Sequence, residues 1–168
     1  SKGFQYEGAE ASFELLARRL MPGYVAPFTL VDFVSMVEKR EGNGHPADIS
    51  SQVMLKVRVA DEVMHTAADG NGPVNSLDNA LRKALLQFYP HLETVRLVDY
   101  KVRVVDQSSS TGAIVRVLIE STDGRKTWNT VGSSENVIEA SWMALSDSME
   151  YWLVRERFAS GAHVAAAS

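Results

Sequence analysis

The amino-acid sequence predicts an α+β fold made of two pseudo-symmetric βββα units. The first observation is the stretch Ala113–Leu153, which reads as a strand, a tight turn at Thr122–Gly124, a second strand and a long amphipathic helix. The second is that this layout recurs sixty positions earlier. The third is that both units open with nearly the same strand, Leu30–Phe33 and Leu97–Tyr100. We therefore interpret the chain as an internal duplication.

Identical residues at a spacing of sixty support this interpretation. They are Val57 and Val117, Gly72 and Gly132, Ala80 and Ala140, Ala84 and Ala144, and Leu85 and Leu145. Strands and amphipathic helices each have one face to bury, so we expect the helices to pack on antiparallel sheets.

Composition excludes several classes of protein. With 168 residues and 45% hydrophobic residues, the chain can form one domain with a sizeable core plus an attached segment. A net charge of −4 gives no reason to expect nucleic acid or an anionic membrane surface. There is no cysteine and no long apolar run, which excludes disulfides, thiolate chemistry and a membrane span. The start lacks both an initiator Met and a signal-peptide pattern, so we expect a piece of a longer cytoplasmic protein.

A helix is predicted first, over Glu7–Leu20, and Met21–Gly23 stops it. It has no counterpart in the second unit. Its apolar face is expected to pack on something outside this sequence, and consists of Ala9, Phe13, Leu16 and Leu20.

The first βββα unit is predicted over about residues 28–90. Its strands are expected at Phe28–Glu38, Met54–Val59 and Val63–Ala68, with a polar loop at Glu41–Gln52 that makes its first hairpin seven residues longer. A helix follows from Pro73 to Phe88. Its buried stripe is predicted to be Leu77, Leu81, Ala84 and Phe88, and its solvent-facing residues Asp78, Arg82 and Lys83.

The second unit is predicted over about residues 94–158, with a strand at Val98–Val105. Its helix has two useful faces. The bulky stripe, expected in the core, is Ile138, Trp142, Leu145, Met149 and Trp152. The second, mostly small stripe, which would let a backbone or a partner approach closely, is Val137, Ser141, Ala144, Ser148 and Tyr151.

Motifs for catalysis are missing from the sequence. The four histidines are scattered without ligand spacing, so we predict no metal site and no catalytic residue. The loop Gly70–Asn75 follows a strand and opens a helix, but Asn75 stands where a dinucleotide fingerprint needs a glycine. Its backbone N–H groups suit a small carboxylate, although the glycines could serve backbone geometry alone. In the matching loop Val131–Asn136, Ser134 is predicted to cap the helix and Glu135 to complement its dipole.

These residues resemble a known family, the C-terminal allosteric domain shared by 2-isopropylmalate synthases and (R)-citramalate synthases, and the likeness is closer to the latter. The segments that carry the resemblance are Gly3–Leu16, Gly70–Asn75, Leu97–Val104, Val115–Glu120 and Trp128–Tyr151.

The resemblance implies a regulatory role. In the full enzyme, linker subdomains join this module to a TIM-barrel domain that condenses acetyl-CoA with pyruvate, using a divalent metal bound in the barrel. The fragment alone is then expected to be inactive and to hold no cofactor. Residues 1–23 would be a linker-subdomain helix, 24–158 the regulatory domain and 159–168 a tail. The module would form a homodimer and bind an end-product amino acid, isoleucine or possibly leucine.

The family's effector region maps onto the Gly70–Asn75 loop and the helix after it. Such loops often carry Asp where this chain has Asn75, which puts an ionic role there in doubt. Three hypotheses remain: an isoleucine- or leucine-binding regulatory module, a dimerisation module without effector binding, and a stand-alone enzyme, which the absence of a catalytic cluster disfavours. The expected effector-binding residues are Gly70, Asn71, Gly72, Pro73, Val74, Asn75, Leu77, Leu81 and Ala84.

Overall fold

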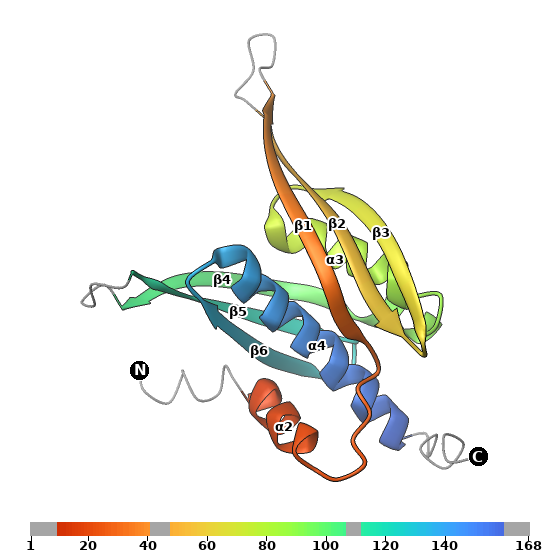
Figure 1. Ribbon diagram of the computed structural model, residues 1–168. Coiled ribbons are helices and arrows are strands. Elements are labelled where there is room, and N and C mark those ends of the chain that lie inside the picture. The colour runs from red at the N-terminus through yellow and green to blue at the C-terminus, as the bar shows by residue number, and fades with distance from the viewer. Residues whose placement is uncertain (1–9, 41–47, 107–111, 160–168) are drawn as a thin grey trace. The chain divides into compact units, whose positions relative to one another are not determined.

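The computed structural model describes residues 10–40, 48–106 and 112–159. The chain forms two compact units. We name Phe28–Glu93 the N-terminal unit, and Ser1–Pro27 together with Thr94–Ser168 the C-terminal unit. In each unit a three-stranded antiparallel sheet is followed by a helix, so the predicted α+β fold with two βββα units is confirmed (Figure 1).

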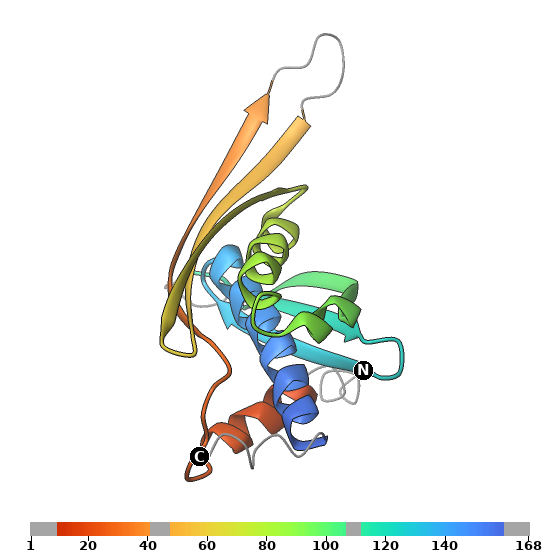
Figure 2. The same ribbon diagram turned by 90° about the vertical axis from the view of Figure 1, so that its right-hand side faces the viewer.

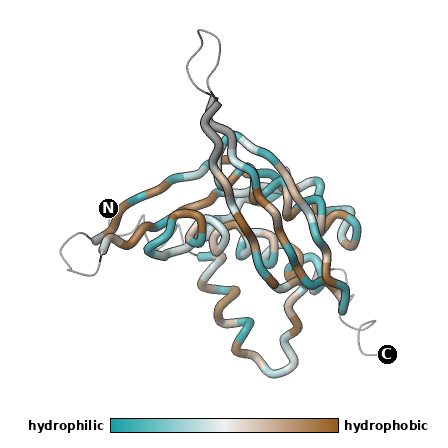
Figure 3. Tube along the Cα trace, turned by 45° about the horizontal axis from the view of Figure 1, so that its top comes forward, coloured by the Kyte–Doolittle hydropathy of each residue, from teal (hydrophilic) through white to brown (hydrophobic). Residues whose placement is uncertain are grey.

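In the N-terminal unit the strands lie in the order β1-β2-β3 and helix α3 packs against β2 and β3 (Figure 2). The elements are β1 (Thr29–Arg40), β2 (Asp48–Val59), β3 (Glu62–Gly70) and α3 (Pro73–Leu85). Hydrophobic and hydrophilic residues alternate along the strands (Figure 3). Every second residue of β2 is buried from Ser51 to Val59, and α3, which packs on this strand, buries Leu77, Leu81 and Leu85.

In the C-terminal unit the sheet order is β4-β5-β6, and α4 packs against β5 and β6. The elements are β4 (Arg96–Asp106), β5 (Ile114–Thr122), β6 (Thr127–Ser134), α4 (Val137–Ala159) and the preceding helix α2 (Glu10–Arg19), while the 3₁₀ turn η1 (Pro90–Thr94) leads into β4. No helix in the described ranges is long and apolar enough to cross a membrane.

The two units correspond at a spacing of 64 residues, not the predicted sixty. The strand pair Leu55–Thr66 recurs as Ile119–Thr130, and the bond from the Thr66 hydroxyl to the Ala80 carbonyl (2.8 Å) recurs from Thr130 to Ala144 (2.7 Å). The two spacings differ by four residues, which is about one turn of a helix and an even number of residues along a strand. A residue assigned with the wrong spacing therefore still falls on the correct face of its helix or strand. The first strands also match: each carries a bulge, between Leu30 and Asp32 and between Leu97 and Asp99.

Several expected boundaries and exposures were wrong. Strand β2 begins at Asp48 rather than Met54, because its pairing with β1 continues to Asp48, opposite Arg40. Within this added part Ser51 is buried, and its hydroxyl hydrogen-bonds to that of Ser76 (3.0 Å). Helix α3 ends at Leu85, so Phe88 lies beyond it. Asp78, expected in solvent, is 9% exposed and receives the guanidinium of Arg82 at 3.0 Å. The remainder of the expected loop, residues 41–47, lies outside the described residues, as do residues 7–9 and 160–168.

The small stripe of α4 does not face a partner. Ser141, Ala144 and Ser148 are fully buried, and the Ser148 hydroxyl hydrogen-bonds to that of Ser121 on β5 at 2.6 Å. Gly132 on β6 lies so close to the helix that a Cβ built there would be 2.0 Å from the Ala140 carbonyl oxygen. The stripe thus lets the strand backbone approach, as expected, but it cannot support dimerisation as well.

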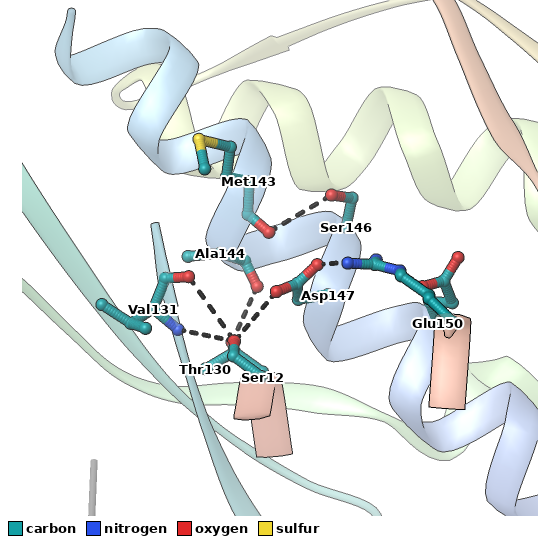
Figure 4. A network of polar contacts seen from close by, with 9 residues as sticks. Ser12, Thr130, Val131, Met143, Ala144, Ser146, Asp147 and Glu150 are labelled. Carbon is teal, nitrogen blue, oxygen red and sulfur yellow. Dashed lines mark hydrogen bonds and ion pairs between the residues drawn. The ribbon is translucent and has the colours of Figure 1, made fainter. Parts of the chain in front are cut away.

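Helix α2 is attached to the C-terminal unit by an apolar contact and a polar network. Ala11 and Leu15 are buried, and α2 packs against α4 and β6. The Ser12 hydroxyl donates to Asp147 Oδ2 (2.9 Å) and accepts from the Val131 N–H (3.0 Å) (Figure 4).

The guanidinium of Arg19 completes this network. It donates to Asp147 Oδ1 (2.9 Å) and, through Nε, to Glu150 Oε2 (2.8 Å). Burial raises the pKa of the Glu150 carboxyl, and the Arg19 charge opposes that shift. The other face of α2, with Phe13, Leu16 and Leu20, is exposed, and its expected packing on something outside this sequence stays a prediction.

We expect Arg19→Met to destabilise the C-terminal unit by about 1–3 kcal/mol, because it removes the ion-pair partner of a buried carboxylate. The pKa of Glu150 should then rise further. A carboxyl whose pKa is raised in the folded state costs stability as pH increases through that pKa, so the deficit should be larger near pH 8 than near pH 5. Denaturation at both pH values measures it. Glu150→Gln, which leaves no charge to compensate, should lose less, and an equal deficit at both pH values would contradict the argument.

Candidate functional site

The expected site lies in the N-terminal unit, where β3 ends and α3 begins. Gly70 is the last residue of β3, and a Cβ built on it would be 2.5 Å from the backbone nitrogen of Ser76. The strand end and the first turn of α3 are therefore in contact, and only glycine fits there. Close packing thus explains the glycine at position 70, which has no positive φ.

Gly72 is different. It is the N-cap of α3, with φ 172° and ψ 174°, an extended conformation open to any residue. A Cβ built on Gly72 would have no atom within 4 Å. Backbone geometry and packing within the described residues therefore do not require a glycine at this position, whereas close approach of a ligand to the backbone would.

Side chains of α3 hold the loop in place. The side-chain oxygen Oδ1 of Asn75 accepts the backbone N–H of Asn71 (3.2 Å), and the side-chain amide of Asn79 donates to the backbone carbonyl of Asp69 (3.0 Å). The Ser76 hydroxyl contacts the Gly72 carbonyl oxygen (3.0 Å). The roles of Asn79 and Ser76 were not predicted, because ordinary polar residues inside a helix carry no sequence pattern that reveals such bonds.

The N-terminus of α3 is open. Gly72 provides no side-chain cap, Pro73 occupies the first turn, and that turn has no acidic residue. By contrast, α4 is capped: the Asn136 side-chain oxygen accepts the N–H groups of Ile138 (2.8 Å) and Glu139 (3.3 Å). An uncapped helix start leaves N–H groups and the positive end of the dipole available to an anion.

The prediction for the start of α4 was wrong in detail. Ser134 was expected to cap the helix, but Asn136 does so, while the Ser134 hydroxyl accepts the Asn136 N–H (3.2 Å) and donates to Glu139 (3.0 Å). Glu139, not Glu135, is the acidic residue of the first turn.

The apolar half of the expected site is part of the core. Leu77, Leu81 and Ala84 have no exposed surface, and Val74 is 6% exposed. The residues Gly70–Asn75 lie together at one end of α3. The apolar side chains of Val74, Leu77, Leu81 and Ala84, however, are not on an open surface. As expected for the buried stripe of an amphipathic helix, they pack toward the sheet.

Comparison with known proteins identifies the domain. The family model of the LeuA allosteric (dimerisation) domain matches residues 7–153. The chain belongs to this family.

Relatives of this allosteric domain include enzymes of two kinds. The chain is 50% identical over 153 residues to the (R)-citramalate synthase of Geobacter sulfurreducens and 47% identical over 155 residues to that of Aquifex aeolicus, alignments that cover 91% and 92% of this chain. It is 32% identical over 91 residues, 54% of this chain, to the 2-isopropylmalate synthase of Shewanella amazonensis. The alignments cover only 28%, 29% and 16% of these relatives, so the chain spans less than a third of their length.

The first strand of the C-terminal unit of this LeuA-type domain has apolar side chains that the helix of the unit leaves uncovered. In the C-terminal unit, Tyr100, Val102 and Val104 pair with Ile119, Val117 and Val115, on the sheet face that carries α4. They are nevertheless 39%, 43% and 53% exposed, because α4 packs on β5 and β6. We call these three residues the β4 strip. A strip of this kind is typical of a surface that another chain covers.

Proposed function

We propose that this chain is the feedback-regulatory and dimerisation domain of an acetyl-CoA-dependent citramalate synthase in isoleucine biosynthesis, with isoleucine as its effector. The family and the names of the most similar relatives support the allosteric role and the type of enzyme. Those relatives are more than three times as long as the matched region, which leaves room for a catalytic barrel outside this sequence. Helix α2 would then belong to the linker to that barrel.

The observation that carries the effector proposal is the open N-terminus of α3. An α-amino acid has a carboxylate, an ammonium group and an apolar side chain. The carboxylate would accept N–H groups of the Gly70–Asn75 loop. The N–H of Asn71 is not among them because Asn75 already accepts it, and Pro73 has none. The helix dipole would add roughly 0.3–1 kcal/mol. The empty space beside Gly72 allows a ligand to approach the backbone. The apolar wall at Leu77, Leu81 and Ala84 remains a prediction that requires the ligand to reach the core.

Gly72→Val is expected to abolish isoleucine binding and leave the fold intact, because a β-branched side chain fits the extended backbone but occupies the space beside it. Isothermal titration of isoleucine into both proteins measures the loss. Ser133→Val, which adds the same side chain at an exposed position of β6, is the matched control and should bind normally. Unchanged affinity in Gly72→Val would make the loop only a turn.

Isothermal titration with isoleucine and with leucine also distinguishes an isoleucine-binding domain from a leucine-binding one and from a domain without an effector. A leucine-binding domain of a 2-isopropylmalate synthase has some support from the Shewanella amazonensis relative. Isoleucine and leucine differ only in the position of one methyl branch, so the preferred one should bind about 1–3 kcal/mol better. If neither binds, the domain serves dimerisation alone.

We further propose that two copies of the chain form a homodimer that covers the β4 strip. Val102→Glu should convert the dimer into a monomer, because it places a charge in an apolar interface. Arg103→Glu, on the opposite face of the same strand, should leave the dimer unchanged. Analytical ultracentrifugation at micromolar concentration distinguishes the two states, and a monomeric wild type of 18.5 kDa would refute the dimer.

A further inference from the structure

The C-terminal unit contains a pocket of about 390 Å³. Its walls come from α2, from the turn between β5 and β6 with the start of β6, and from the last turns of α4. Pockets of roughly 300–1,000 Å³ hold small organic ligands. The pocket belongs to a different unit from the β3–α3 loop, so it is a separate candidate.

Two tryptophan rings give the pocket rigid apolar walls. Trp128 and Trp152 are 6% and 7% exposed. The Trp128 indole N–H donates to the Ser148 hydroxyl (3.1 Å), and that of Trp152 donates to Asp123 Oδ2 (3.0 Å). Because both polar ends are already bonded, the rings are fixed in place and present their apolar parts to a ligand.

Three cationic side chains from three elements line the same pocket: Arg18 of α2, Lys126 of the turn and Arg155 of α4. The Arg155 guanidinium lies 5.4 Å from the centroid of the Tyr151 ring and donates to the Tyr151 hydroxyl. Arg18 is 3.8 Å from Glu14 on its own helix. Guanidinium groups bind carboxylates through paired hydrogen bonds, and a planar group held over a ring loses little freedom when it does so.

Two carboxylates, those of Asp123 and Glu156, also line the pocket. Asp123 is held by the indole of Trp152 and by the backbone N–H groups of Arg125 and Lys126, each 2.8 Å from Asp123 Oδ1. Burial acts to raise the pKa of Asp123, but these hydrogen bonds lower it below its usual value, so the group stays ionised. The pocket therefore offers fixed negative as well as positive charge.

We propose that this pocket is a second ligand site of the domain, and that its ligand is a free α-amino acid. The three surfaces that such a ligand needs all meet here: cations for the carboxylate, Asp123 and Glu156 for the ammonium group, and the rings of Trp128 and Trp152 for the side chain. A bound ligand would also tie α2 to α4, because Arg18 and Arg155 stand on these two helices. The site would thus control how firmly the preceding helix is held.

The experiment is a fluorescence titration of the whole chain with L-isoleucine, L-leucine and L-valine. All three tryptophans of the sequence lie in the C-terminal unit, and two of them line the pocket. At least one of these amino acids should change the tryptophan emission saturably. Two analogues of the amino acid test the charged contacts: the amine that lacks the carboxylate, and the carboxylic acid that lacks the ammonium group. Each should bind at least about tenfold more weakly than the amino acid, because each loses a charge-assisted hydrogen bond.

Arg155→Met should weaken the fluorescence response at least about tenfold, and Arg155→Lys should restore part of it. Arg125→Met is the matched control, because Arg125 is exposed in the turn between β5 and β6, next to Lys126, but does not line the pocket. Circular dichroism establishes that each variant is folded. Should Arg155→Met fail to fold, Lys126→Met on the exposed turn tests the same prediction.

The proposal of a second site in this pocket can be refuted independently of the proposed isoleucine binding at the β3–α3 loop. A flat titration, a response equal in Arg155→Met and wild type, or equal binding of the carboxylic acid alone would overturn the second site, even if Gly72-dependent binding persists in calorimetry. A response that survives Gly72→Val but is lost in Arg155→Met supports it, whether or not the β3–α3 loop binds anything.

Discussion

Gly132→Ala should destabilise the C-terminal unit by about 3 kcal/mol or more, at the upper end of the range for overpacked cores. The added Cβ would lie 2.0 Å from the Ala140 carbonyl oxygen, 2.8 Å from the Met143 Cβ and 2.9 Å from the Ala144 nitrogen. Two of these atoms belong to the backbone of α4, so no side-chain rotation can relieve the clash. The helix would have to move off β6 and lose the bond between Thr130 and the Ala144 carbonyl.

Chemical denaturation followed by tryptophan fluorescence measures this loss, because all three tryptophans report on the C-terminal unit. Gly72→Ala is the control in the other unit, and because that unit contains no tryptophan its stability is followed by amide hydrogen exchange. The alanine Cβ would meet no atom within 4 Å, so the substitution should cost less than about 1 kcal/mol: an N-cap disfavours alanine relative to glycine, and the reduced freedom of the unfolded chain partly offsets this. A Gly132→Ala protein as stable as the wild type would mean that α4 and β6 are not in contact as described.

Much of the fold could be predicted from local patterns. Alternation along β2 and the turn at Gly124, which has φ 91°, are properties of short stretches. The repeat was recognisable for the same reason, but its true spacing was not. A shift of four residues preserves both the helical and the strand periodicity, so these patterns cannot distinguish a spacing of 60 from one of 64. The spacing becomes clear only from residue pairs on different strands, such as Leu55 with Thr66.

The candidate site was predictable as a segment but not as a set of contacts. The sequence placed a glycine-rich loop before a helix, yet it could not tell that Gly70 is required by packing and Gly72 is not. From the sequence, the small stripe of α4 could pack either against a backbone or against a partner. The close approach of Gly132 identifies the strand as the neighbour, and such an approach depends on residues far apart in the chain.

Leu81→Ala should destabilise the N-terminal unit by about 2–5 kcal/mol, because Leu81 has no exposed surface and the substitution leaves a cavity between α3 and the sheet. Leu81→Met conserves volume and should cost less than about 1.5 kcal/mol. The N-terminal unit contains no tryptophan, so amide hydrogen exchange is the suitable measurement. Protection should fall in α3 and β2 and remain unchanged in α4 and β5.

The same variant decides whether Leu81 also forms a wall of the effector site. A ligand that binds only the folded state adds stability that depends on its concentration relative to its dissociation constant. If isoleucine contacts Leu81, the stability that it adds should be smaller in Leu81→Ala than in wild type, beyond the loss that the cavity causes alone. If isoleucine adds the same stability to both proteins, Leu81 serves the core only. The effector would then be held by the Gly70–Asn75 backbone and by side chains other than Leu81.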